Sequence, residues 1–281
     1  MTTFNERYWK FTNTMSNVLV LVSNVHRLSI DFLFPTSLFP TQINISSLQS
    51  NNPSDDWCSV NDLGEFGLLL GVYDGISNSA ASEATAHHLP NYILKHLQRA
   101  NITKDLKPST TISLIKGALE AGVTNFDDEI FETFFNLQES FLKTTSKAKK
   151  AELRFLLDGI WQATNYGTVA ILCLIHPTGI YVANIGDSRA VLGRRGEYSC
   201  IPLSHDQDGT SKAEEERFIR ELGDNPICGN RVAGYGPARM ISCMEAKYDK
   251  EILRVKDEVD KDYWTSFLSD YLMKYTPTLQ P

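Results

Sequence analysis

An apolar run that ends at an Asp-Gly pair constrains the fold of this chain more than any other feature. Residues 68–73 read Leu-Leu-Leu-Gly-Val-Tyr, and Asp74 and Gly75 follow. A continuous apolar run of this kind predicts a buried strand, which places a carboxylate and an approachable backbone carbonyl at a sheet edge. Hard divalent cations select such oxygen ligands. Strand-Asp-Gly is also a common turn, and that alternative stays open.

Four further segments carry information about the family. Residues 166–171 read Tyr-Gly-Thr-Val-Ala-Ile, and residues 180–192 read Ile-Tyr-Val-Ala-Asn-Ile-Gly-Asp-Ser-Arg-Ala-Val-Leu. Residues 51–56 read Asn-Asn-Pro-Ser-Asp-Asp, and residues 203–209 read Leu-Ser-His-Asp-Gln-Asp-Gly. Together with Asp74-Gly75, these segments resemble the metal-dependent protein phosphatases of the type 2C family, and most closely the pyruvate dehydrogenase phosphatase branch. The resemblance runs from about Gln42 to the C-terminus.

The resemblance implies an α+β fold of two packed antiparallel β-sheets flanked by helices, with a metal cleft at one edge. It divides the chain into an N-terminal extension, residues 1–41, and a phosphatase-like domain, residues 42–281. We expect this domain to be incomplete, because the family's last catalytic block and last strands have no counterpart before Pro281.

The implied reaction is hydrolysis of phosphoserine or phosphothreonine on a protein by a water that two Mg²⁺ or Mn²⁺ ions activate. By resemblance, Asp74 bridges the two ions and the Gly75 carbonyl binds one of them. Asp55 and the adjacent Asp56 match acidic positions that act on the metal cluster. Asp187 matches a further, weaker metal site, although a turn aspartate that bonds local amides is an equal alternative.

Two departures from the family pattern concern the chemistry. Ile76 replaces a histidine that is thought to protonate the leaving group, and no catalytic residue can be assigned in its place. Proton transfer from a general acid raises a reaction rate by about 10²–10⁴-fold. Cys243 stands where the family has an aspartate ligand, and cysteine is too soft for Mg²⁺ or Mn²⁺. We therefore expect weak metal binding and impaired activity. An inactive pseudophosphatase that binds partners, or a truncated gene product, is the alternative.

Composition limits the partners. With 42% hydrophobic and 22% charged residues the chain is typical of a globular protein. Its net charge of -7 disfavours nucleic acid, and no apolar stretch reaches the roughly 20 residues of a membrane span. Five scattered cysteines fit a reducing compartment. The expected partner is a phosphoprotein, with a mitochondrial dehydrogenase complex as the candidate. The resemblance implies a mitochondrial location, with the cytoplasm as the alternative.

Local patterns predict the remaining elements. We expect helices over residues 80–97 and 111–141, a hairpin of strands 167–175 and 179–184, and further strands over 190–192 and 198–203. Residues 143–150 are basic and small, which predicts a loop or a helix end. Ser211 and Glu214 have the spacing of a capping box, which opens a helix that ends at Leu222. Gly186 is expected in a turn that a β-carbon would strain, with Arg189 paired to a carboxylate.

Overall fold

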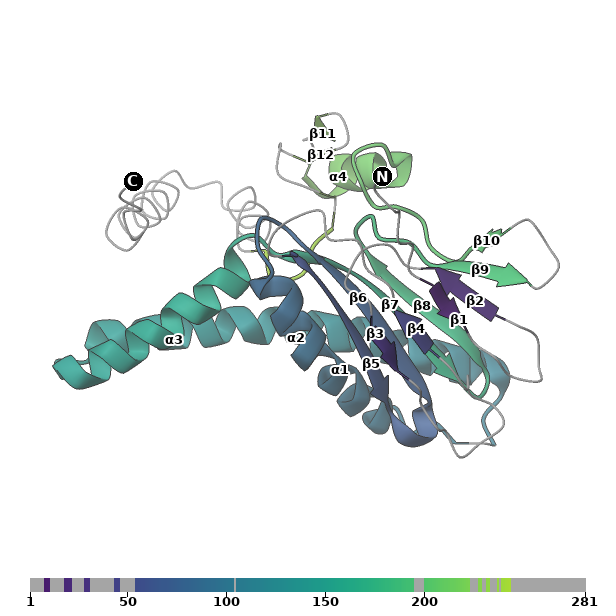
Figure 1. Ribbon diagram of the computed structural model, residues 1–281, viewed down its shortest axis with the longest axis horizontal. Coiled ribbons are helices and arrows are strands. Elements are labelled where there is room, and N and C mark those ends of the chain that lie inside the picture. Colours follow the sequence, from purple (N-terminus) through teal and green to yellow (C-terminus); the bar gives the residue numbers. More distant parts are fainter. Residues whose placement is uncertain are drawn as a thin grey trace.

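The protein has two layers of β-sheet, and its longer helices lie on one outer face (Figure 1). The computed structural model describes residues 8–10, 18–21, 28–30, 43–45, 54–103, 105–194, 200–222, 227–228, 231–232, 237 and 239–243. The predicted α+β class, with antiparallel sheets and flanking helices, is confirmed. The division of the chain at residues 41 and 42 stays a prediction.

The central sheet has four antiparallel strands in the order β5-β6-β7-β8. Their bounds are Asp56–Asp62, Leu68–Gly75, Thr168–His176 and Gly179–Ile185. All residues of β6 are buried except the half-buried Asp74. The predicted buried strand that ends at Asp74 and Gly75 is therefore confirmed, and burial on both faces explains why its sequence does not alternate.

The two faces of β6 pack against different layers. Leu69 and Tyr73 belong to the core beneath helices α1 (Ala80–Arg99) and α2 (Pro108–Lys143). Leu68, Leu70 and Val72 belong to the core between the sheets. This assignment follows the two-residue period of a strand, and it ties both hydrophobic layers to one element.

The second layer begins with strands from the N-terminal part of the chain. Ile43 and Ile45 of β4 are buried against β6 and β7. A strand from residues 18–21 pairs with one from residues 191–194, so sequence-distant segments form this layer. Its strands are β1 (Tyr8–Lys10), β2 (Val18–Leu21), β9 (Val191–Arg194) and β10 (Cys200–Pro202) in one sheet, and β3 (Leu28–Ile30) with β4 (Ile43–Ile45) in another.

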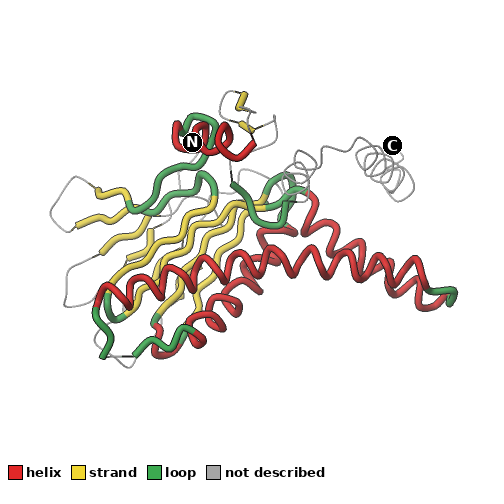
Figure 2. Tube along the Cα trace, turned by 180° about the vertical axis from the view of Figure 1, so that it is seen from behind, coloured by secondary structure: helices red, strands yellow, loops and turns green. Residues whose placement is uncertain are grey.

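The helices on the outer face lie in front of the sheet in Figure 2. The predicted helices over residues 80–97 and 111–141 are confirmed as α1 and α2. Helix α3 (Lys147–Asn165) was not predicted. The basic residues 143–150 occupy the end of α2 and the start of α3, separated by only three residues. Leu153 and Leu157 of α3 are buried, yet exposed apolar residues beside them obscure a helical pattern.

The predicted helix ending at Leu222 is α4 (Lys212–Leu222), and strands β11 (Ile227–Cys228) and β12 (Arg231–Val232) follow it. The capping-box prediction was wrong. The Glu214 carboxylate accepts hydrogen bonds from Arg217 (2.8 Å) and Arg239 (3.0 Å), whereas the Ser211 N–H donates to the Asp208 carbonyl. A buried carboxylate gains more from two guanidinium groups than from one amide.

Gly186 joins β8 to the turn before β9. Its φ is +100°, and an added Cβ would lie 2.3 Å from Val169 Cγ1. Both the backbone conformation and the contact with β7 exclude a side chain, as predicted. Gly117 in α2 is the opposite case, because an added Cβ there would meet nothing within 4 Å.

We expect Gly186→Ala to lower the free energy of unfolding by about 1–3 kcal/mol through backbone strain and the Val169 clash. Gly117→Ala, the matched control, should raise it by about 0.5–1 kcal/mol because glycine is a poor helix former. Urea unfolding of both variants measures the difference. Equal midpoints for Gly186→Ala and the parent protein would contradict this account of the turn.

Candidate metal centre

The candidate site lies where β5 begins and β6 ends. In the register of these strands, Asp56 is directly opposite Asp74. Side chains at opposite positions of an antiparallel pair lie close together, and like charges there destabilise the sheet. The fold therefore places two carboxylates in a repulsive arrangement at this edge of the sheet.

Asp74 shows the electrostatic result of that arrangement. The pKa of Asp74 is raised to about 7, and burial is the largest cause. The charge of Asp56, a hydrogen bond with Asp56 and the charges of Asp187 and Asp55 raise it further. Asp56 lies opposite Asp74 in the sheet, and Asp55 and Asp187 are near enough for their charges to act on it. Burial and this repulsion together favour a proton on Asp74 close to neutral pH.

The backbone around Gly75 is packed too closely for any side chain. The Gly75 N–H donates to the Asp55 carbonyl at 3.1 Å. An added Cβ on Gly75 would lie 2.4 Å from the carbonyl oxygens of Asp55 and Asn78. The Ser82 hydroxyl of α1 also donates to the Asp55 carbonyl. Gly75 is therefore required for the approach of three backbone segments at the site.

Thr168 and Asn78 fix the chain on either side of Gly75. The Thr168 hydroxyl donates to the Asp74 carbonyl at 2.7 Å, and Thr168 is opposite Gly75 in the β6–β7 register. The Asn78 side chain accepts a hydrogen bond from the Ala80 N–H at 2.9 Å, which satisfies a free donor at the start of α1. The strand end and the following helix are thus held at fixed positions.

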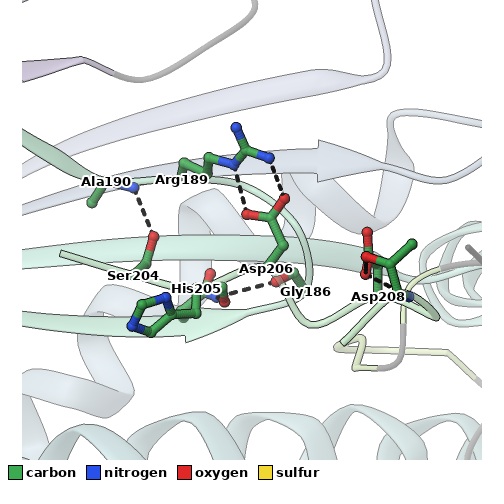
Figure 3. A network of polar contacts seen from close by, with 9 residues as sticks. Gly186, Arg189, Ala190, Ser204, His205, Asp206 and Asp208 are labelled. Carbon is green, nitrogen blue, oxygen red and sulfur yellow. Dashed lines mark hydrogen bonds and ion pairs between the residues drawn. The ribbon is translucent and has the colours of Figure 1, made fainter. Parts of the chain in front are cut away.

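The turn after β8 carries Asp187 and Arg189. Arg189 donates two hydrogen bonds to Asp206, at 2.7 and 2.6 Å (Figure 3). The predicted pairing of Arg189 with a carboxylate is confirmed. Partial burial raises the pKa of the Asp187 carboxyl, and the charges of Asp206 and Asp208 raise it further, while a hydrogen bond from its own backbone N–H and the charge of Arg189 oppose the rise. The acidic character of the site therefore extends to the segment after β10.

That segment also holds the turn in place through backbone and side-chain hydrogen bonds. The Gly186 N–H donates to the Gln207 side chain at 2.9 Å, and the Gln207 N–H donates to the Gly186 carbonyl at 2.9 Å. The Ala190 N–H donates to the Ser204 hydroxyl, as Figure 3 shows. Asp187 is thereby anchored on both sides, although its own role as a metal ligand stays a prediction.

Ile76 and Cys243, the two departures from the family pattern, contact the same glycine. The Ile76 N–H donates to the Gly167 carbonyl at 3.1 Å. An added Cβ on Gly167 would lie 2.6 Å from Cys243 Cβ. Ile76 is half-buried and Cys243 is buried. The structure therefore brings both substitutions to the site rather than to a remote surface.

A comparison with family models finds a match to "Protein phosphatase 2C" over residues 68–262, well over half of the chain. This chain belongs to the protein phosphatase 2C family. The match includes Asp74, Gly75 and Asp187.

Individual relatives agree with this family. The human mitochondrial [pyruvate dehydrogenase [acetyl-transferring]]-phosphatase 2 is 25% identical over 94% of this chain and 56% of its own length. The probable protein phosphatase 2C 4 of Paramecium tetraurelia is 27% identical over 72% of this chain and 58% of its own. The chain thus spans little more than half the length of these relatives.

A solved serine/threonine phosphatase of Mycobacterium tuberculosis, PstP/Ppp, is 16% identical. It aligns with 79% of this chain and 71% of its own, with a TM-score of 0.33. This similarity is too low to support a conclusion. No helix in the described part of the chain is long and apolar enough to cross a membrane.

The donors at this phosphatase 2C site suit a hard cation. They are carboxylates and backbone carbonyls, the ligands that Mg²⁺ and Mn²⁺ prefer, and a cation would relieve the repulsion at Asp74. Across residues 54–103, 105–194 and the other described ranges, no three His, Cys, Asp or Glu side chains lie close enough together to hold a metal ion. The assignment of Asp74, Gly75, Asp55, Asp56 and Asp187 as ligands therefore stays a prediction.

Sequence reasoning missed a buried connection between α2 and the site. Asp127 accepts a hydrogen bond from the Ser242 N–H at 2.7 Å, across 115 positions in the chain. Ile241 and Thr168 exchange two backbone hydrogen bonds, at 2.8 and 2.9 Å. Thr168 could have been found from its place after Gly167 in a family motif. Nothing in the local sequence marks Asp127.

The raised pKa of Asp74 predicts a pH-dependent stability. The folded protein holds this proton more tightly than the unfolded chain. The resulting stabilisation is full below the ordinary pKa of 3.8 and is lost as the pH rises to about 7. In chelator, Asp74→Asn should therefore be more stable than the parent protein at about pH 8, with the difference shrinking towards about pH 4.

Urea unfolding at both pH values measures this effect, and Asp158→Asn on the exposed side of α3 serves as the control, with no such difference expected. If Asp74→Asn is the less stable protein at the higher pH in chelator, Asp74 is a structural turn residue and the metal assignment is wrong.

Proposed function

We propose that this domain is a metal-dependent protein serine/threonine phosphatase with slow turnover. The observation that carries the proposal is the meeting of Asp56 and Asp74 across β5 and β6, with Asp55 and Asp187 near enough to act on their charge. Membership of the protein phosphatase 2C family supplies the reaction class.

Asp74, the Gly75 carbonyl, Asp55, Asp56 and Asp187 would hold Mg²⁺ or Mn²⁺. When bound, the ions supply a water of lowered pKa and positive charge for the phosphate oxygens. Asp74 must lose its proton before it can act as a ligand, so affinity for the ions should rise with pH through neutrality.

Other residues of the chain position these ligands. The Thr168 hydroxyl fixes the Asp74 carbonyl, and the missing side chain of Gly75 permits the close approach of the Asp55 and Asn78 carbonyls. The bonds between Gly186 and Gln207 set the turn that carries Asp187. Positions fixed before the reaction reduce the free energy needed to assemble the site.

Slow turnover follows from Ile76 and Cys243. Isoleucine cannot transfer a proton to the leaving group, and the loss of a general acid lowers the rate of catalysis by about 10²–10⁴-fold. A buried thiol contributes neither the charge nor the hard oxygen that a Mg²⁺ ligand needs. The same two observations favour the second candidate function, an inactive pseudophosphatase that uses the fold to bind partners.

The substrate proposed for this domain is a phosphoprotein, and the candidate is a mitochondrial dehydrogenase complex. This proposal is supported by the names of two relatives, the human phosphatase 2 and the bovine mitochondrial [pyruvate dehydrogenase [acetyl-transferring]]-phosphatase 1, the latter 26% identical over 64% of this chain. The same names support a mitochondrial location.

Restoring the missing groups should reveal the activity. With Mn²⁺ and a phosphothreonine peptide, we expect the parent protein to turn over slowly. Ile76→His should raise the rate about 10–100-fold by returning a proton donor. Cys243→Asp should tighten Mn²⁺ binding, measured by calorimetry, because it adds a hard anionic ligand.

The control is Asp74→Asn in each background, which should abolish the activity, as should a chelator. Ile180→His, on an exposed part of β8, should leave the rate unchanged. If Ile76→His and Cys243→Asp together show no hydrolysis that depends on Asp74, the inactive pseudophosphatase is the better account.

A further inference from the structure

Helices α2 and α3 form a hairpin arm that extends beyond the sheets, as both views show (Figures 1 and 2). We call residues 131–159 the arm. Phe131, Phe134 and Leu157 make a separate hydrophobic core within it. Because this core does not contact the sheet, the arm is held together by its own packing and carries its outer surface away from the phosphatase site.

The outer surface of the arm exposes large apolar side chains. Phe155 is 79% exposed and the adjacent Leu156 is 43% exposed, and Leu142 at the end of α2 is 67% exposed. Gly159 lies one helical turn beyond Phe155, and an added Cβ there would meet nothing within 4 Å. Phe155 and Gly159 share one face of α3. A bulky exposed ring next to an open position offers a contact surface for another helix.

The hairpin end of the arm concentrates positive charge. Between residues 143 and 154 the chain has five cations and one carboxylate, Glu152, whereas the rest of the arm adds three carboxylates, Glu132, Glu139 and Asp158, and no cation. Lys147, Lys149 and Lys150 occupy the first turn of α3, which contains no acidic residue. Cations are unfavourable at a helix N-terminus, where the helix dipole is positive.

Pairs within the arm relieve this charge only in part. Lys149 lies 2.8 Å from Glu152, Arg154 lies 4.0 Å from Asp158, and Lys143 pairs with Glu139. Lys150 stands over the ring of Phe141. These pairs are exposed and contribute little. An external anion at the first turn of α3 would be stabilised by both the lysines and the helix dipole, so the charge complement of this end of the arm is acidic.

We propose that the arm is a docking site for an acidic amphipathic helix of a partner protein. Apolar side chains of the partner pack on Phe155, Leu156 and the open position at Gly159. Its carboxylates lie against Lys147 and the first turn of α3. Glu152, on the same face as Phe155, disfavours an anionic lipid surface, whereas a protein can place a cation opposite it. The docking does not depend on the phosphatase chemistry.

The test uses a fluorescein-labelled synthetic helix of Glu, Ala and Leu, with Leu at every third or fourth position, and measures its anisotropy on titration with the parent protein. We expect saturable binding that weakens with added salt. Phe155→Ala and Lys147→Glu should each weaken binding at least about tenfold. Ile219→Ala on α4, 51% exposed, is the matched control and should bind as the parent protein does.

Circular dichroism verifies that Phe155→Ala, a change of an exposed side chain, remains folded. Equal affinity of Phe155→Ala and the parent protein, or equal binding of a probe with Lys in place of Glu, overturns the proposal. The proposal is also overturned if sedimentation velocity shows a dimer that Phe155→Ala dissociates, because the arm would then be an interface between copies of this chain. Cosedimentation with phosphatidylcholine–phosphatidylglycerol vesicles that Phe155→Ala abolishes would point to lipid instead.

Discussion

The pairing of β6 with strands on both sides positions the whole candidate site. It sets Asp74 opposite Asp56 and Gly75 opposite Thr168. A slip of one residue would turn the apolar side chains of β6 to the wrong layers. The hydrophobic cores on its two faces therefore fix the register, and the register fixes which carboxylates meet. The packing of apolar side chains along β6 thus determines which charged groups lie next to each other at its end.

The carboxylates meet at a cost to stability. Burial and three neighbouring acids oppose the charge on Asp74, and the close backbone approach at Gly75 leaves no room for the strand end to move apart. A protein that needed only a turn would gain from a neutral residue here. Costs of this kind are retained where a ligand offsets them, and a divalent cation is the ligand that the oxygen donors suit.

The elements that follow local rules were predictable from the sequence. The β6 strand, the conformation of Gly186 and the charge pairing of Arg189 depend on neighbours in the chain or on a family motif. Helix α3 was missed because exposed apolar residues such as Phe155 hide its pattern. The pairing of Glu214 with Arg239 and the bond from Asp127 to Ser242 depend on segments that only the fold brings together, so no local signal marks them.

The central claim is that this edge of the sheet binds a divalent cation. Crystals grown with Mn²⁺ and measured near the manganese absorption edge test it most directly, because anomalous scattering locates the ion itself. The account predicts a peak within about 2.0–2.6 Å of an Asp74 carboxylate oxygen or the Gly75 carbonyl. Crystals that contain Mn²⁺ but show no peak at Asp74, at a pH where its carboxylate is ionised, would contradict it.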